Sequence, residues 1–210
     1  HCAGHNGVGA VMGAKKLKAF CAARGRAKVP VKDSERLTTA VNAMWEAIQS
    51  WGMSKSIFDW GTGGSYEMGE QRVIVGTLPV KNYTTNLYPE ARLMTSQHSR
   101  EHFQARLNPC WACRQHHCHM ITITEGKYRG LTVEEPEYEM YAAWGPLVGN
   151  TDPVETLVLS NLLTLLGLEG NEAGFLVSMV IELYEKGVLK KEKTEGLELK
   201  WDNAAAIRTL

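Results

Sequence analysis

Apolar side chains recur at helical spacing over much of the chain. After Ser34, which can cap a helix, they return every three or four positions, at Leu37, Val41, Met44, Trp45 and Ile48. Similar patterns and capping residues predict further helices over residues 90–107, after Pro136, from Asp152 to Gly167, over residues 172–186, and from Asp202 or Asn203 onward.

Other stretches predict turns and strands. Residues 7–13 are rich in glycine and predict a tight turn, whereas residues 17–22 and 121–124 alternate apolar and polar side chains as strands do. Residues 78–83 predict an extended segment. The sequence therefore predicts a mainly α fold, an irregular helical domain with a few short strands near the N-terminus and around residue 122.

Charge and hydropathy remove two classes of partner. Lysine plus arginine equals aspartate plus glutamate, 23 against 23, so the net charge favours neither nucleic acid nor an anionic membrane. The most apolar stretch, residues 154–168, contains Glu155 and is too short and too polar to span a bilayer. We therefore expect no nucleic-acid binding and no membrane insertion.

Both ends of the sequence suggest a piece of a larger protein. The chain begins at His1 and enters a glycine-rich segment at once, with no secretion signal in view. The helix expected after Asn203 has not ended when the chain stops at Leu210. We expect a segment that is truncated on its C-terminal side.

Three of the five cysteines lie within nine residues, at Cys110, Cys113 and Cys118. An odd and clustered set indicates metal ligands in a reducing compartment, so we expect a cytoplasmic protein. The C-x2-C-x4-C spacing suits a 4Fe–4S cluster that takes its fourth ligand from distant sequence. Zinc fits the spacing equally well, because a nearby histidine could complete a Cys3His site: His116, His117 or His119.

Several segments, in order along the chain, resemble the tungsten-containing aldehyde:ferredoxin oxidoreductase family. Residues 7–19 (GVGAVMGAKKLKA) resemble the family's G-x-G-A-V-M-G-S-K-x-L-K-A segment, and residues 110–113 (CWAC) resemble the start of its cluster loop. Further similar segments are residues 78–83 (LPVKNY), 135–139 (EPEYE), 144–146 (WGP), 149–152 (GNTD), 167–169 (GLE) and 182–187 (ELYEKG).

The resemblance implies a place in a larger multidomain α+β enzyme. Residues 1–28 would be the tail of its N-terminal pterin-binding domain, and residues 29–210 most of its middle helical domain. Such an enzyme holds tungsten, or molybdenum, between two pterins and oxidises a small aldehyde to a carboxylic acid. Electrons leave through the 4Fe–4S cluster to ferredoxin or another electron-transfer protein. The segment alone would be inactive, because the remaining domains complete the enzyme.

The resemblance also assigns roles to residues. Glu139 matches a glutamate beside the metal that could accept a proton, and Tyr138 could donate a hydrogen bond to substrate. Without the resemblance, the same glutamates are an acidic helix start favoured by the helix dipole. The resemblance assigns cofactor binding to two groups of residues. In the first group, Cys2, Ala3 and Gly4 match a position where backbone carbonyls meet a magnesium ion that bridges the pterin phosphates, and Gly7 and Gly9 follow them. The second group matches a pterin loop and consists of Gly167, Leu168 and Glu169.

Departures from the family pattern keep other functions open. Thr164 stands where the family has an aspartate, and the cluster loop has one extra residue before Cys118. One alternative is a family member that reduces an acyl or aromatic substrate at low potential. Another is a non-enzymatic helical domain that binds zinc or a cluster.

Overall fold

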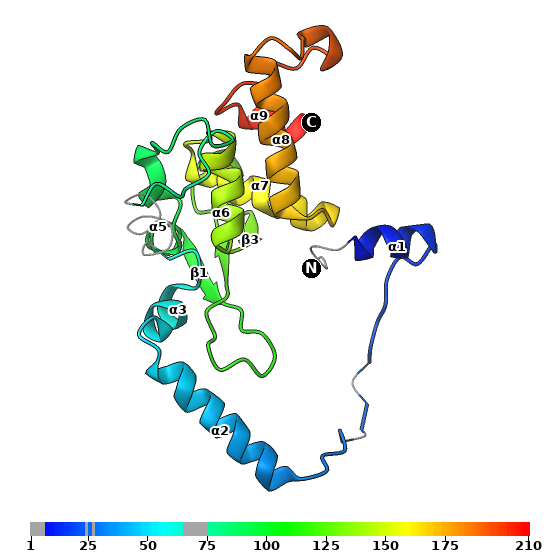
Figure 1. Cartoon of the computed structure of the whole chain (residues 1–210), viewed down its shortest axis with the longest axis vertical. Coiled ribbons are helices and arrows are strands. Elements are labelled where there is room, and N and C mark those ends of the chain that lie inside the picture. The colour runs from blue at the N-terminus through cyan, green and yellow to red at the C-terminus, as the bar shows by residue number, and fades with distance from the viewer. Residues whose placement is uncertain (1–6, 24, 27, 65–74) are drawn as a thin grey trace.

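The computed structural model describes residues 7–23, 25–26, 28–64 and 75–210. Over these residues the chain is mainly helical, as predicted, and Figure 1 shows α1 set apart from the other elements. No helix in the described part combines the length and apolar character needed to cross a membrane. The α-helices are α1 (Val8–Ala14), α2 (Ser34–Ser50), α3 (Ser54–Trp60), α5 (Ser96–His102), α6 (Tyr138–Trp144), α7 (Pro153–Leu166), α8 (Gly170–Glu185) and α9 (Ala204–Thr209).

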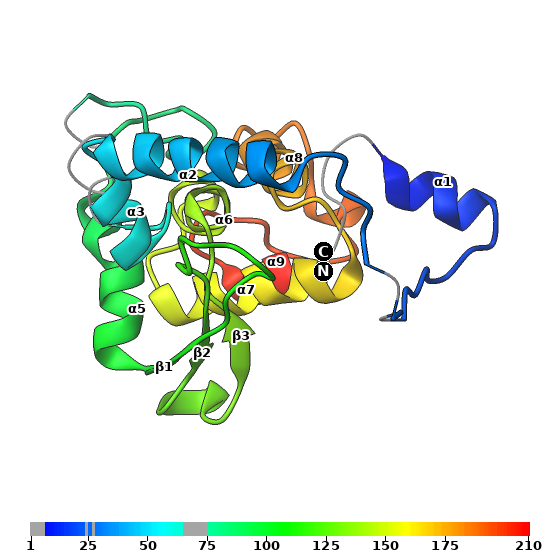
Figure 2. The same ribbon diagram turned by 90° about the horizontal axis from the view of Figure 1, so that it is seen from below.

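Short 3-10 helices and three strands complete the architecture. The 3-10 helices are η2 (Pro89–Leu93), η3 (Gly126–Tyr128), η4 (Pro146–Val148) and η5 (Lys191–Lys193). The strands β1 (Gln104–Leu107), β2 (His119–Thr122) and β3 (Thr132–Glu134) form one antiparallel sheet in chain order. Figure 2 shows the three strands side by side. The strand expected around residue 122 is therefore confirmed as β2.

Polar side chains fix where several helices begin. α2 begins at the predicted Ser34, but its cap is Asp33, whose carboxylate accepts a backbone hydrogen bond at 2.9 Å. Asp152 caps α7 in the same way at 2.8 Å, as predicted, and Asn203 caps α9 at 3.2 Å. Each cap satisfies a backbone N–H group that would otherwise lack a partner at a helix start.

The junction between α7 and α8 follows the predicted pattern with one shift. Gly167 ends α7 with a left-handed φ of 70°, a conformation that glycine adopts without steric cost. α8 starts at Gly170, earlier than the predicted residue 172. The reason is the Glu169 side chain, which caps the helix by accepting from the backbone N–H of Glu172 at 2.5 Å.

Two predictions near the N-terminus are wrong. Residues 7–13 lie largely in helix α1 rather than in a tight turn, and Gly7 precedes the helix with a φ of 65°. Residues 17–22 form no strand. A strand is stable only when another strand pairs with it, and no described segment pairs with these residues.

The single helix predicted over residues 90–107 is also wrong. Thr95 interrupts it, because its hydroxyl accepts from the backbone of His98 at 3.2 Å and starts α5 as a separate helix. After Phe103 the chain turns into β1, where Gln104 pairs with Thr122 of β2. Pairing with a distant strand therefore overrides the local helical pattern.

The extended segment predicted over residues 78–83 ends in a turn instead. Lys81, Asn82 and Tyr83 have left-handed φ angles of 45°, 53° and 61°. Two backbone hydrogen bonds, of 2.9 and 3.2 Å, dock this turn onto η4. A tertiary contact of this kind leaves no signal in the local sequence.

α6 connects the two parts of the hydrophobic core. Its Tyr141 packs with sheet residues such as Ile121, whereas its Trp144 packs with residues of α7, α8 and α9. Tyr141 and Trp144 are both almost fully buried. The packing holds α6 firmly and fixes the direction of its first turn, which borders the candidate site.

Candidate functional site

The three cysteines lie in the loop that connects β1 to β2. The two strands are antiparallel neighbours, so they bring the loop ends together, and Asn108 N donates to Cys118 O at 2.8 Å. Cys113 N donates to Cys110 O at 3.2 Å, which makes the tight turn that C-x2-C spacing predicts. Two further bends have left-handed φ angles of 58° and 52°, at Ala112 and His116.

The cysteine thiols are free, and two of them are close together. Cys110 is exposed and Cys113 and Cys118 are partly buried, and the sulfurs of Cys110 and Cys118 lie 3.9 Å apart. Burial and the neighbouring Cys110 thiol raise the pKa of Cys118 to about 12, so this thiol must give up its proton when it binds a metal. Three thiols on one closed loop are a donor set that fits an iron–sulfur cluster.

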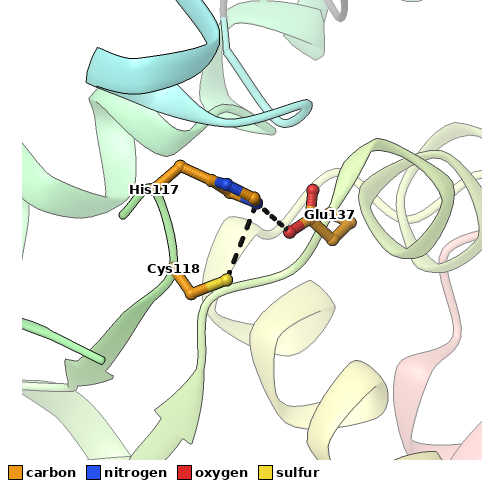
Figure 3. Close-up of side chains that lie close together, drawn as sticks. All are labelled: His117, Cys118 and Glu137. Atoms are coloured by element: carbon orange, nitrogen blue, oxygen red, sulfur yellow. Dashed lines mark hydrogen bonds and ion pairs between the residues drawn. The ribbon is translucent and has the colours of Figure 1, made fainter. Parts of the chain in front are cut away.

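A histidine–carboxylate pair lies against the last cysteine. His117 Nε2 lies 2.8 Å from Glu137 Oε1 and 3.6 Å from Cys118 Sγ, as Figure 3 shows. The hydrogen bond to Glu137 raises the pKa of His117. Burial alone would raise the pKa of Glu137, but the hydrogen bonds from His117 and Thr62 outweigh burial and lower it. The two shifts have opposite directions, and each favours the charged form of its group.

A buried ion pair holds the C-terminal end of the same loop. Arg100 donates to the two carboxylate oxygens of Glu135 at 2.7 and 2.6 Å, and the two side chains are 12% and 4% exposed. Arg100 also donates to the carbonyl of His117 at 3.2 Å, and His119 Nδ1 donates to that carbonyl at 2.7 Å. The backbone next to Cys118 is therefore fixed from two directions.

Two hollows border the first turn of α6. The first, of about 190 Å³, is lined on the cysteine side by Cys118, Glu137 and Thr164, among others. The second, of about 150 Å³, is lined by Tyr138, Glu139, Tyr83 and Phe175, among others. Glu137 precedes α6 in an extended conformation and Glu139 lies in its first turn, and the two border different hollows.

The structure brings the two predicted catalytic residues together. Tyr138 and Glu139 line the same hollow, beside the stacked rings of Tyr83 and Phe175, whose centroids are 6.2 Å apart. Glu139 is exposed in this chain. Its catalytic role stays a prediction.

The residues expected to bind pterin are in separate places. Gly167, Leu168 and Glu169 form the α7–α8 junction, whereas Gly7 and Gly9 lie at α1, which Figure 1 shows apart from α7 and α8. Cys2, Ala3 and Gly4 lie outside the described residues. Cofactor binding by either group stays a prediction.

Sequence reasoning missed the polar residues around the cysteine loop. The sequence presents Glu137 only as one of several glutamates in an acidic run, and it predicts for His117 only a role as a possible zinc ligand. No local pattern indicates that Arg100 pairs with Glu135, because the pair joins α5 to the segment before α6. Only the C-x2-C-x4-C motif was visible from local spacing.

Several cysteines on one loop are typical of proteins that bind zinc or an iron–sulfur cluster. A sequence model of the family described as "Aldehyde ferredoxin oxidoreductase, domains 2 & 3" matches residues 39–210. The chain belongs to the aldehyde ferredoxin oxidoreductase family, which is a family of oxidoreductase enzymes. The family resemblance found in the sequence motifs is thereby confirmed.

Curated relatives cover nearly the whole chain. The chain is 30% identical to an "Aliphatic sulfonate oxidoreductase, WOR-like subunit" of Pyrococcus furiosus, over 100% of this chain and 33% of the relative. It is also 30% identical to a "Tungsten-containing aldehyde ferredoxin oxidoreductase" of that organism and 27% identical to one of Thermococcus kodakarensis, each over 98% of this chain. The chain spans about a third of the length of these relatives.

Proposed function

We propose that this chain is the electron-transfer segment of a tungsten-pterin aldehyde oxidoreductase, in which Cys110, Cys113 and Cys118 bind a 4Fe–4S cluster. The observation that carries the proposal is that all three thiols lie on one closed loop next to the start of α6. Family membership supports it, and so do the names of two relatives, which are called tungsten-containing. The fourth ligand of the cluster would come from outside this loop.

The reaction would convert a small aldehyde and water into a carboxylic acid, two protons and two electrons. When bound, a tungsten or molybdenum bis-pterin supplies the redox chemistry. In this chain Gly167, Leu168 and Glu169 would contact one pterin. Gly7 and Gly9 would contact the phosphate side of the pterins, together with a magnesium ion at residues 2–4.

Tyr138 and Glu139 would act on the substrate from the hollow that they share. The Glu139 carboxylate would accept a proton as water adds to the aldehyde carbon, and the Tyr138 hydroxyl would donate a hydrogen bond to the substrate oxygen. Both residues lie on the first turn of α6 and line the same hollow, which supports the proposal that they act on one substrate.

The electron acceptor would be ferredoxin or a similar small protein. Cys110 is exposed and the neighbouring Trp111 is 95% exposed, so this side of the loop is open to a partner. Electron transfer requires such an approach to the cluster edge. Reduced thiols fit a cytoplasmic location.

One observation favours a zinc site as the second candidate. Two sulfurs bound to one tetrahedral zinc at about 2.3 Å each lie about 3.8 Å apart, close to the 3.9 Å between Cys110 and Cys118. In that case His117, which is near Cys118, would be a ligand, and the domain would have a structural rather than a redox role.

Iron and acid-labile sulfide analysis of the intact protein, purified without oxygen, separates the two candidates. We expect iron and sulfide in equal amounts, and we expect Cys113→Ser to abolish the visible absorption of the cluster. Cys21→Ser, which changes an exposed cysteine outside the loop, serves as the control. Zinc without sulfide, or unchanged absorption in Cys113→Ser, would contradict the proposal.

Dye reduction by the intact enzyme tests the substrate. Aldehyde-dependent reduction of a viologen dye is expected. A fully cluster-loaded protein without this activity would favour the alternative family reaction, the low-potential reduction of an acyl or aromatic substrate.

A further inference from the structure

We propose that His117 is a positioning residue that sets the reduction potential of the cluster by sharing its Nε2–H group between Glu137 and the Cys118 sulfur. The inference rests on the proposed function, since it requires a cluster on Cys118. A hydrogen bond to a ligand sulfur stabilises the more negative, reduced state of a cluster and so raises its reduction potential. His117 would therefore decide how readily the cluster accepts electrons.

The His117 ring is fixed by its surroundings. It packs against Gly61 at the end of α3, where an added Cβ would lie 2.8 Å from the ring carbon Cδ2. Its Nδ1 atom is buried and has no partner among the described residues. Turning the ring over would move Nε2 away from both of its neighbours, Glu137 and Cys118.

Glu137 is itself held in place from the other side. It precedes α6, and its second oxygen accepts a hydrogen bond from the Thr62 hydroxyl. That hydroxyl in turn accepts from the backbone N–H of Tyr138 at 2.9 Å. Thr62, Glu137 and His117 thus form a chain of hydrogen bonds that runs from the first turn of α6 to the cysteine loop.

The chain of hydrogen bonds determines which nitrogen carries the proton. An ionised carboxylate can only accept, so the 2.8 Å contact with Glu137 requires a proton on His117 Nε2. The Nε2 atom is 3.6 Å from Cys118 Sγ, so the N–H group that donates to Glu137 can make a weak second contact with the sulfur once the thiol has lost its proton. A protonated nitrogen cannot be a metal ligand, which separates this role from direct ligation.

The test uses the intact protein with three substitutions. His117→Phe keeps the ring shape and removes the N–H group, and His117→Gln places an amide N–H near the same point. His116→Phe makes the same change at the exposed neighbouring histidine and is the matched control. The measurements are iron and sulfide content, the EPR-monitored redox titration of the cluster, and the hyperfine coupling of its exchangeable protons.

We expect every variant to hold the wild-type amount of iron and sulfide. His117→Phe should shift the midpoint potential to a more negative value and lose an exchangeable-proton coupling, His117→Gln should restore much of both, and His116→Phe should change neither. If His117→Phe does not fold, His117→Leu replaces it. An unchanged potential in the folded variant would overturn the inference and leave the cluster assignment intact.

Two further results would overturn the inference, because they would make His117 a ligand of the cluster. One is loss of iron from a folded His117 variant, and the other is a strong hyperfine coupling between the cluster and a nitrogen in the wild-type protein. Zinc without sulfide in the wild-type protein is a different failure. It would overturn the proposed function, and this inference with it.

Discussion

Glu137 and Glu139 are two residues apart in sequence but have different surroundings. Glu137 is half-buried, is paired with His117 and borders the hollow that contains Cys118. Glu139 is exposed and borders the hollow of Tyr138. One short segment, residues 137–139, therefore contacts both the proposed cluster site and the proposed substrate site.

Replacement of Glu139 tests its catalytic role. We expect Glu139→Gln in the intact enzyme to retain tungsten and iron but to lower kcat by about 10²–10⁴-fold, because a general base is removed without loss of volume. Metal analysis and dye-reduction kinetics measure the two effects. Glu172→Gln, an equivalent change at an exposed position on α8, should leave kcat unchanged. Near-normal turnover in Glu139→Gln would make Glu139 a surface residue.

The sequence predicts side chains whose roles depend on local spacing, and misses those that depend on tertiary contacts. The tight turn of Cys110 and Cys113 follows directly from the C-x2-C motif. Arg100 meets Glu135 only because α5 and the segment after β3 pack together. No pattern within either segment indicates this pair. Because the pair is buried, each charge needs its partner, and removal of either one would leave an unpaired charge in the interior.

At the scale of elements, α6 and α8 approach closely at two glycines. An added Cβ at Gly174 would lie 2.8 Å from Ala143 Cβ, and one at Gly170 would lie 2.1 Å from Met140 Sδ. The absence of side chains at these points lets α8 lie directly against α6. The contact holds in place the helix that carries Tyr138 and Glu139.

A substitution at Gly174, which faces the short side chain of Ala143, tests this packing. Gly174→Ala should lower the free energy of unfolding by about 1–3 kcal/mol through overpacking, despite the better helix propensity of alanine. Urea unfolding of the intact protein measures the change. In an Ala143→Gly background, which makes room, the same substitution should cost much less. An equal cost in both backgrounds would show that the two residues are not coupled.

Helices with a clear cap were predicted well, and elements that depend on a partner were not. Asp152, Gly167 and Asn203 mark helix ends through bonds to their own backbone neighbours. The region over residues 90–107 has a helical pattern, but its last part pairs with β2. The energy of that pairing comes from residues that a local window does not contain.

The whole chain exposes a large apolar surface at one end. A hollow of about 430 Å³ lies between α7, α8 and α9, and it is lined almost wholly by apolar side chains such as Leu163 and Val177. Around it, Leu166 is 61% and Leu176 is 58% exposed. Contiguous apolar surface of this kind is uncommon on soluble monomers.

Dye binding should report this surface. We expect the 210-residue chain on its own to enhance the fluorescence of ANS, and the double variant Leu166→Lys, Leu176→Lys to reduce the enhancement several-fold. Leu87→Lys, at a single leucine that is 76% exposed, is the control and should have little effect. Equal fluorescence from all three proteins would mean that the dye binds elsewhere. Near-UV circular dichroism checks that each protein remains folded.

The left-handed glycine at position 61 has a consequence for the cysteine loop. The His117 ring packs directly against Gly61, which has no Cβ, although the two residues belong to different elements. A side chain at position 61 could be accommodated only with less bulk at position 117 or with a shift of the loop. The bond between His117 and Glu137 therefore depends on a residue with no side chain at position 61.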